Sequence, residues 1–154
     1  MKSISNRTLQ KQLDVAGKIC VQRKARLTPL RSALLKLIYQ YDKPVSAYDL
    51  LKMLRQSHPH AEAMTVYRGL EFWMSVGVLH KLAGNNTYTA CPHPDQDHFG
   101  QLLLCQRCGK STEIQETNLS QLIKKVAEKN HFSIQAQLIE ISGVCEGCSG
   151  SASS

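Results

Sequence analysis

Four of the six cysteines form two Cys-x-x-Cys pairs, Cys105 with Cys108 and Cys145 with Cys148. The two-residue gap lets both thiolates of a pair turn onto one ion, and two pairs together supply the tetrahedral all-thiolate site that structural zinc prefers. The 36 residues between the pairs exceed a compact zinc-ribbon loop, so we expect zinc to join the two ends of a small folded domain. Two disulfides are the alternative. Residues 1–12 are polar and lack the apolar core of a secretory signal, which favours a reducing compartment and a metal site.

A second group of possible metal ligands lies between the two halves of the chain. It consists of His80, Cys91, His93, Asp95, Asp97 and His98, with Glu113 after the first cysteine pair. One thiolate, two imidazoles and a carboxylate would form a mixed tetrahedral site, and the thiolate favours zinc over iron(II) or manganese. The alternative is that Cys91 is a buried apolar residue and the histidines lie on the surface, because free cysteine is commonly buried and inert. Cys20, on an apolar helical face, fits that alternative better.

Periodic apolar residues predict the helices that must position these ligands. One helix spans residues 9–24, and a second begins at Thr28-Pro29, an N-cap followed by proline at the first helical position. A third is capped by Ser46. A fourth covers residues 64–76 and ends at Gly77.

After Gly77 the period of the sequence changes to that of strands. Residues 78–82 and 87–90 flank Gly84-Asn85-Asn86, which is a hairpin signal. The last three of these helices followed by a β-hairpin are the layout of a winged helix-turn-helix.

The second half predicts a small mixed domain. Residues 91–100 are polar and contain two prolines, which predicts a hinge. Short strands are expected at 101–104 and 111–115, an amphipathic helix at 118–130 and a strand at 134–141. The predicted fold class is therefore α+β, with a small C-terminal α/β domain stapled by zinc.

Charge divides the chain in the same way. The formal net charge is +7, and residues 1–83 carry 14 Lys and Arg against 5 Asp and Glu, whereas residues 84–154 carry 5 against 7. A basic half joined to a slightly acidic half suggests that the first half meets a polyanion, although an ordinary basic surface is the alternative. No apolar run approaches the roughly 18 residues that a membrane span requires.

In a helix-turn-helix the recognition helix contacts base edges in the major groove, and residues 64–76 are the candidate here. Its apolar stripe must face the core, which leaves Thr65, Tyr67, Arg68 and Glu71 toward solvent or DNA. Arg68 can bind a guanine edge bidentately or contact a phosphate. Tyr48 offers an aromatic face or a hydroxyl. We expect Arg31 and Lys81 to contact phosphates, with an ordinary solvated surface position as the alternative.

These residues resemble the ferric uptake regulator (Fur) superfamily of metal-dependent repressors, and most closely its zinc uptake regulator (Zur) branch. The resemblance covers residues 8–148 and includes the Asx-rich hairpin. It rests on the motifs Arg26-Leu27-Thr28-Pro29-x-Arg31, Ser46-Ala47-Tyr48-Asp49-Leu50-Leu51, Thr65-Val66-Tyr67-Arg68-x-Leu70, Cys105-Gln106-Arg107-Cys108-Gly109 and Cys145-x-x-Cys148.

The resemblance implies a winged-helix DNA-binding domain at residues 1–90, a hinge at 91–100 and an α/β dimerisation domain at 101–148. The sequence itself predicts a disordered tail at 149–154. The two cysteine pairs match the family's structural zinc ligands, and Tyr48 and Arg68 match its base-proximal contacts. The regulatory ligands implied by the Zur branch are His80, Cys91, His98 and Glu113.

The chain departs from the family in its hinge. The common His-His-x-His motif is replaced by His93-Pro94-Asp95-Gln96-Asp97-His98, and no histidine lies between His98 and His131 or within 134–141. A third, iron-type site and a peroxide-sensing role are therefore not supported. His93, Asp95 and Asp97 could still offer ligands to an auxiliary metal site.

The resulting hypothesis is a zinc-responsive transcriptional repressor of zinc-uptake genes. It predicts two Zn²⁺ per chain, a cytoplasmic homodimer without membrane contact, and a double-stranded DNA operator with an inverted repeat. Alternatives are a Fur-type repressor that senses iron, manganese or nickel, a scaffold held by zinc, and a zinc hydrolase or deaminase with Glu113 as general base. Zinc deaminases carry Pro-Cys-x-x-Cys, whereas Leu104 precedes Cys105 here, so we expect no enzyme.

Overall fold

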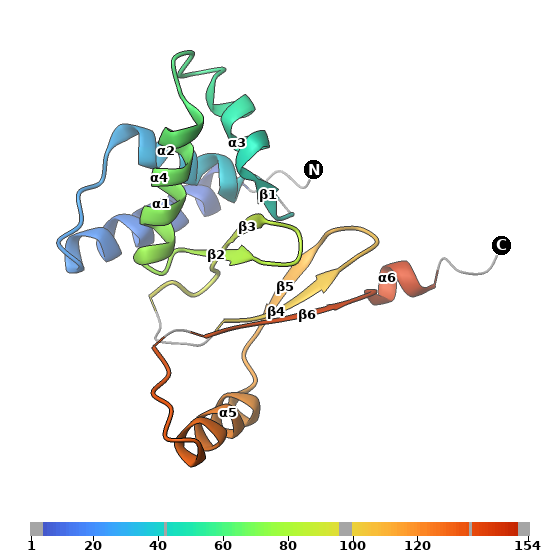
Figure 1. Ribbon diagram of the computed structural model, residues 1–154. Coiled ribbons are helices and arrows are strands. Elements are labelled where there is room, and N and C mark those ends of the chain that lie inside the picture. The colour runs from blue at the N-terminus through green and yellow to red at the C-terminus, as the bar shows by residue number, and fades with distance from the viewer. Residues whose placement is uncertain (1–4, 42, 96–99, 136, 151–154) are drawn as a thin grey trace. The chain divides into compact units, whose positions relative to one another are not determined.

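The chain divides into two units, Met1–Gln96 and Asp97–Ser154. The computed structural model describes residues 5–41, 43–95, 100–135 and 137–150. Each unit has its own sheet (Figure 1). Among the described residues, no helix is both long and apolar enough to cross a bilayer.

The helices of the first unit are α1 (Asn6–Gln22), α2 (Pro29–Tyr39), α3 (Ala47–Leu54) and α4 (Ala63–Ser75). The predicted caps are confirmed, because Thr28 and Ser46 accept hydrogen bonds from the first-turn amides of Arg31 and Asp49. α4 ends at Ser75, and Gly77 follows two residues later with a φ of 75°, in the left-handed region that glycine adopts without strain.

A three-stranded antiparallel sheet completes this unit, in the order β1-β3-β2. The predicted hairpin is confirmed as β2 (Leu79–Leu82) and β3 (Thr87–Ala90), with Lys81 opposite Tyr88. The short strand β1 (Val45–Ser46) pairs with the start of β3 and was not predicted. Together, α2, α3, α4 and the hairpin form a winged helix-turn-helix (Figure 1).

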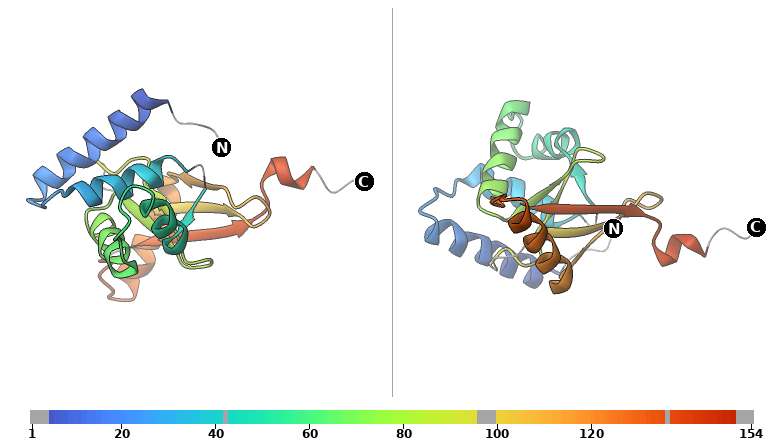
Figure 2. Two further views of the ribbon diagram at one scale, coloured as in Figure 1. Left: turned by 90° about the horizontal axis from the view of Figure 1, so that it is seen from above. Right: turned by 60° about the horizontal axis from the view of Figure 1, so that its bottom comes forward.

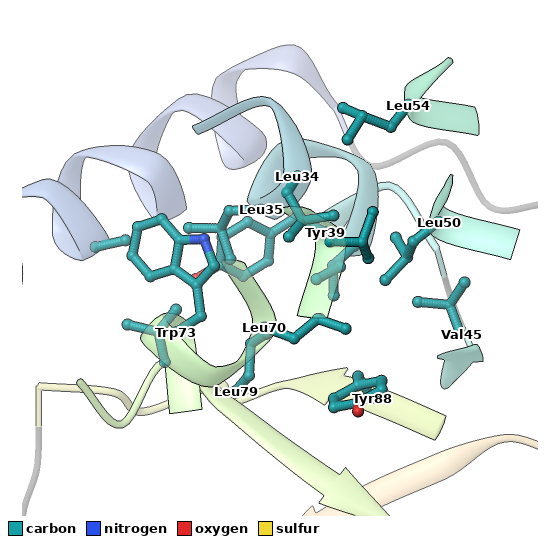
Figure 3. Close-up of a cluster of buried hydrophobic side chains, with 14 of the residues drawn as sticks. Leu34, Leu35, Tyr39, Val45, Leu50, Leu54, Leu70, Trp73, Leu79 and Tyr88 are labelled. Atoms are coloured by element: carbon teal, nitrogen blue, oxygen red, sulfur yellow. The ribbon is translucent and has the colours of Figure 1, made fainter. Parts of the chain in front are cut away.

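The core of the first unit lies where the helices meet the hairpin (Figure 3). Four leucines in it are completely buried: Leu34, Leu50, Leu54 and Leu70. Each stabilises the fold by about 1.5–3 kcal/mol relative to an exposed position. The only tryptophan, Trp73, is also completely buried and donates its indole N–H to the backbone carbonyl of Arg31 at 3.0 Å. This contact fixes α4 against the first turn of α2.

The second unit contains β4 (Gly100–Cys105), β5 (Ser111–Ile114), α5 (Thr117–Lys129), β6 (Leu138–Gly143) and α6 (Glu146–Ser149). β4 pairs antiparallel with β5 and parallel with β6, and β6 continues into α6 (Figure 2). A parallel pair needs a crossover, which α5 provides. Buried Gln101 donates to the Glu116 carbonyl at 3.1 Å and to the Ser120 hydroxyl at 2.8 Å, and thereby holds the start of α5 on β4.

Two predictions for this unit are corrected. The strand expected at 134–141 begins only at Leu138, because Leu138 pairs with Gly100, where β4 itself starts. Ser149, expected to be the first residue of the disordered tail, is instead the last residue of α6. Residues 151–154, and residues 96–99 of the expected hinge, lie outside the described residues.

Candidate metal centres and nucleic-acid interface

The two cysteine pairs meet at one end of the sheet in the second unit. The Sγ atoms of Cys105, Cys108, Cys145 and Cys148 all lie within 4.8 Å of one another, and Cys108 and Cys145 are 3.9 Å apart. A zinc tetrahedron with Zn–S bonds of about 2.3 Å has sulfur–sulfur edges of roughly 3.8 Å. None of these four cysteines forms a disulfide. The arrangement therefore fits a tetrahedral metal site rather than the alternative of two disulfides.

Local backbone builds each half of this four-cysteine site. The first pair occupies the turn between β4 and β5, where Gly109 has φ 71° and donates to the Cys105 carbonyl at 2.9 Å. The second pair starts α6, and the Cys145 amide donates to the Cys105 sulfur at 3.4 Å. Arg107 donates from Nη1 to the Cys148 carbonyl at 2.6 Å. That last bond ties the first turn directly to the second.

The acidities of these thiols also favour a cation. Hydrogen bonds from the backbone N–H of Cys108 and then of Cys145 lower the pKa of Cys105 to about 6. The pKa of Cys148 is raised to about 12, mainly by its contacts with the side chains of Cys145 and Cys108. The first thiolate therefore forms easily and the last one is opposed by its neighbours. A bound dication removes that opposition, because it stabilises all four thiolates at once.

A second pair of candidate ligands lies within the first unit. His80 is on β2, and Cys91 follows β3 directly and donates its amide to the Val78 carbonyl at 2.9 Å. This pairing brings a ring nitrogen of His80 and the sulfur of Cys91 within 4.8 Å of each other. Cys91 is 1% exposed, as the alternative of a buried apolar residue expects, and its ligand role stays a prediction.

Of the five remaining predicted ligands, the structure describes Glu113, His93 and Asp95. Glu113 lies on β5 in the second unit, so its distance from the His80–Cys91 pair depends on how the two units are arranged. His98 and Asp97 lie outside the described residues, and His93 and Asp95 are exposed. Cys20 is buried in α1, as its apolar helical face predicted.

The exposed face of α4 carries the candidate DNA contacts. Val66, Gly69, Leu70 and Trp73 form its buried face, while Tyr67 and Arg68 are exposed and Thr65 is half-buried. Tyr48, at the start of α3, is 75% exposed, so its ring and hydroxyl are accessible to a partner. Met64 at the start of α4 is 58% exposed, and the sequence pattern marked it only as the helix boundary.

Lys81 and Arg31 were both expected to contact phosphates, and they differ in their surroundings. Lys81 is exposed on the wing, with its ammonium 5.9 Å from the centre of the Tyr88 ring. The guanidinium of Arg31 lies 3.6 Å from the centre of the Phe72 ring and donates to the Arg26 carbonyl. Arg31 is therefore engaged within the protein. Its contact with Phe72 was missed, because it depends on how α2 crosses α4.

A winged helix-turn-helix joined to a separate unit with a four-thiolate site defines the class of metal-dependent DNA-binding proteins. The chain belongs to the ferric uptake regulator family, whose sequence pattern matches residues 22–142. It is 39% identical over 142 residues to the zinc uptake regulation protein of Escherichia coli, covering 92% of this chain and 83% of that protein.

Solved structures of regulators are similar in fold. A zinc uptake regulator complexed with zinc and DNA shares 38% sequence identity with a TM-score of 0.88, covering 93% of this chain and 96% of that one. The crystal structure of holo XcZur shares 35% identity with a TM-score of 0.82, covering 90% and 97%.

Proposed function

We propose that the protein is a zinc-responsive DNA-binding transcriptional repressor of zinc-uptake genes. The observation that carries this is the combination of a four-thiolate cluster with a second His–Cys pair in a winged-helix protein. The relatives with 39% and 38% identity are named as zinc uptake regulators, and one of them is complexed with zinc and DNA. The function is regulatory rather than catalytic, and it places the protein in the cytoplasm with the DNA.

The proposal assigns two zinc ions to each chain. Cys105, Cys108, Cys145 and Cys148 would hold the structural ion, whose four thiolates leave no open position for a substrate. His80, Cys91, His98 and Glu113 would hold the regulatory ion. The Cys91 thiolate supports zinc rather than iron or manganese as the sensed metal, because those metals prefer nitrogen and oxygen donors.

The regulatory ligands come from both units, which suggests how zinc would control DNA binding. His80 and Cys91 belong to the winged-helix unit, whereas Glu113 belongs to the other. Ligation by all three would restrict the arrangements that the two units can adopt. Zinc can favour the DNA-binding arrangement only by binding it more tightly than the others. A coupling of about 1–3 kcal/mol would strengthen DNA binding roughly 5- to 150-fold.

The proposal includes a homodimer formed through the second unit. α5 has no fully buried residue, and large apolar side chains are exposed on α5 and β6 and just after each of them. They are Leu122, Val126, Phe132, Leu138, Ile141 and Val144. Covering such a surface with a second copy would give a two-fold dimer with two recognition helices. Its operator would then be an inverted repeat.

In this assembly α4 would enter the major groove, with Arg68, Thr65 and Tyr67 toward the bases. Tyr48 would contact bases from the start of α3, and Lys81 would contact a phosphate from the wing. A Fur-type repressor that senses iron, manganese or nickel is the competing proposal. This competing proposal differs from the zinc proposal in the metal that His80 and Cys91 would bind.

The test is DNA binding by the purified protein in metal-chelated buffer and at defined free zinc, iron(II), manganese and nickel. DNA selected by the zinc-loaded protein from a random duplex library serves as the probe. Zinc should strengthen DNA binding by 5-fold or more, whereas iron(II), manganese and nickel should have the same effect only at free concentrations far above that of zinc. Equal affinity with and without zinc would refute the zinc-responsive repressor.

A further inference from the structure

We propose that Arg31 sets the orientation of the recognition helix through Phe72, and so determines DNA specificity without contacting DNA. This inference rests on the proposed DNA-binding role of α4. Its basis is the guanidinium of Arg31, which stacks on the Phe72 ring 3.6 Å from its centre. A planar cation on an aromatic face is attracted by the ring quadrupole, most strongly where water is partly excluded.

The contact with Phe72 is one of three that Arg31 makes between α2 and its neighbours. The guanidinium also donates to the carbonyl of Arg26, which fixes the loop before α2. The backbone carbonyl of Arg31 accepts the indole N–H of Trp73 at 3.0 Å. One residue of α2 therefore holds two successive residues of α4, Phe72 by its side chain and Trp73 by its backbone.

Phe72 lies four residues after Arg68 on the same helix, and residues spaced by four share a helical face. Holding Phe72 therefore fixes the rotation of α4 about its axis, and with it the direction of Arg68. The far end of α4 is also held, because Arg23, the residue that follows α1, donates from Nη1 to the Ser75 carbonyl at 3.4 Å. Base readout requires such fixed geometry, since a bidentate contact to guanine tolerates little misplacement.

The alternative role for Arg31 is a phosphate contact. Substitution by lysine distinguishes this role from the positioning of α4. Lysine keeps the positive charge but has no planar fork, so it cannot stack on Phe72 and donate to Arg26 in the same way. A phosphate contact survives Arg31→Lys, whereas positioning does not. Phe72→Leu removes the other partner of the stack without changing any charge.

The experiment uses the full zinc-loaded chain and two duplexes, one selected by the wild-type protein from a random library and one of random sequence. The variants are Arg31→Lys, Phe72→Leu, the double variant and Arg31→Gln, with Lys36→Gln on α2 as an exposed control that also removes one charge. For each we measure the ratio of the two dissociation constants and the dependence of affinity on salt. Trp73 fluorescence and the melting temperature report the packing of α4 and the folded fraction.

We expect Arg31→Lys and Phe72→Leu each to lower the specificity ratio by about 2- to 30-fold, the range of a partly buried cation–π contact. The double variant should lose little more than the worse single variant, because both break the same contact. Trp73 emission should shift in each, whereas Lys36→Gln should keep both the ratio and the emission. The salt slope of Arg31→Gln should match the wild type.

Three results would overturn the proposal. Arg31 is a phosphate contact if Arg31→Gln lowers the slope of log affinity against log salt by about 0.9 and Arg31→Lys keeps the specificity ratio. Additive losses in the double variant show that Arg31 and Phe72 act separately. Equal losses for both duplexes, matched by the unfolded fraction, show a role in stability alone. Failure of the wild type to select any duplex would instead refute the proposed DNA-binding function.

Discussion

Gly69 of α4 lies directly against Leu34 of α2: a β-carbon added at Gly69 would be 2.6 Å from the Cδ2 atom of Leu34. Real β-carbons do not approach other atoms so closely, so the two helices are in contact here because residue 69 has no side chain. Leu34 is completely buried and cannot swing into solvent. The recognition helix is therefore seated on α2 at the position between Arg68 and Leu70.

We expect Gly69→Ala to destabilise the first unit by about 1–3 kcal/mol, the usual cost of overpacking a filled core. This loss would outweigh the roughly 1 kcal/mol by which alanine favours a helix over glycine. Chemical denaturation followed by Trp73 fluorescence measures the change. Leu34→Val removes the colliding atom, so the double variant should be more stable than the sum of the two single losses predicts.

Gly17 provides the matched control, because it is also helical but a β-carbon there would meet nothing within 4 Å. Gly17→Ala should stabilise the protein by up to about 1 kcal/mol. If both alanine variants changed stability in the same direction, the close approach of α2 and α4 would not explain the need for glycine at position 69.

The second prediction concerns the four-cysteine site. Cys145→Ser should lower the zinc content by one ion per chain and unfold or monomerise the second unit. Structural zinc contributes about 10–16 kcal/mol of apparent folding free energy in zinc-finger peptides, which is comparable to the whole stability of a typical domain, about 5–15 kcal/mol. Metal analysis, circular dichroism and sedimentation measure the three effects.

Cys20→Ser is the control for this experiment, since Cys20 is buried in α1 and is no member of either ligand group. Its zinc content should equal that of the wild type. A Cys145→Ser protein that kept all its zinc and its dimer would show that the four thiols do not form the structural site.

How far the sequence predicted this molecule depends on the length of each pattern. The helices and the hairpin were predicted because their caps, apolar periods and glycines act within a few residues. The strand β1 and the helix α6 have two and four residues, too few to show a period. The start of β6 was misplaced, because its partner strand rather than its own sequence decides where pairing begins.

The same distinction holds for the site. The Cys-x-x-Cys spacing predicted the four-thiolate cluster, since a two-residue gap constrains the geometry locally. The proximity of His80 and Cys91 depends on the hairpin register, in which His80 pairs with Thr89 two residues before Cys91. The stack of Arg31 on Phe72 depends on the crossing of two helices, and no motif in the sequence encodes it.

The third prediction concerns base readout. Arg68→Ala should weaken binding to the selected duplex by about 1–3 kcal/mol if Arg68 binds a guanine edge bidentately. Binding to random DNA should change much less, and the zinc content should stay the same. Fluorescence anisotropy with both duplexes measures the two affinities. An equal loss for both would identify Arg68 as a phosphate contact.

The last prediction separates sensing from folding. Cys91→Ser should remove the regulatory ion while leaving a folded dimer with its structural zinc, because Cys91 is in the first unit and the four-cysteine site is in the second. Serine replaces the thiol with a poor zinc ligand of similar size. Operator affinity should then be equal with chelator and with added zinc, whereas the wild type should gain about 5- to 150-fold.

His80→Ala should reproduce this loss of zinc response, because His80 is the other ligand candidate within the first unit. By linkage, DNA must tighten zinc binding in the wild type by the same factor by which zinc tightens DNA binding. Neither effect should occur in the two variants. Zinc titration with and without the selected duplex measures this second factor independently. A Cys91→Ser protein that still bound its operator tightly only when zinc was added would place the sensor outside the His80–Cys91 pair.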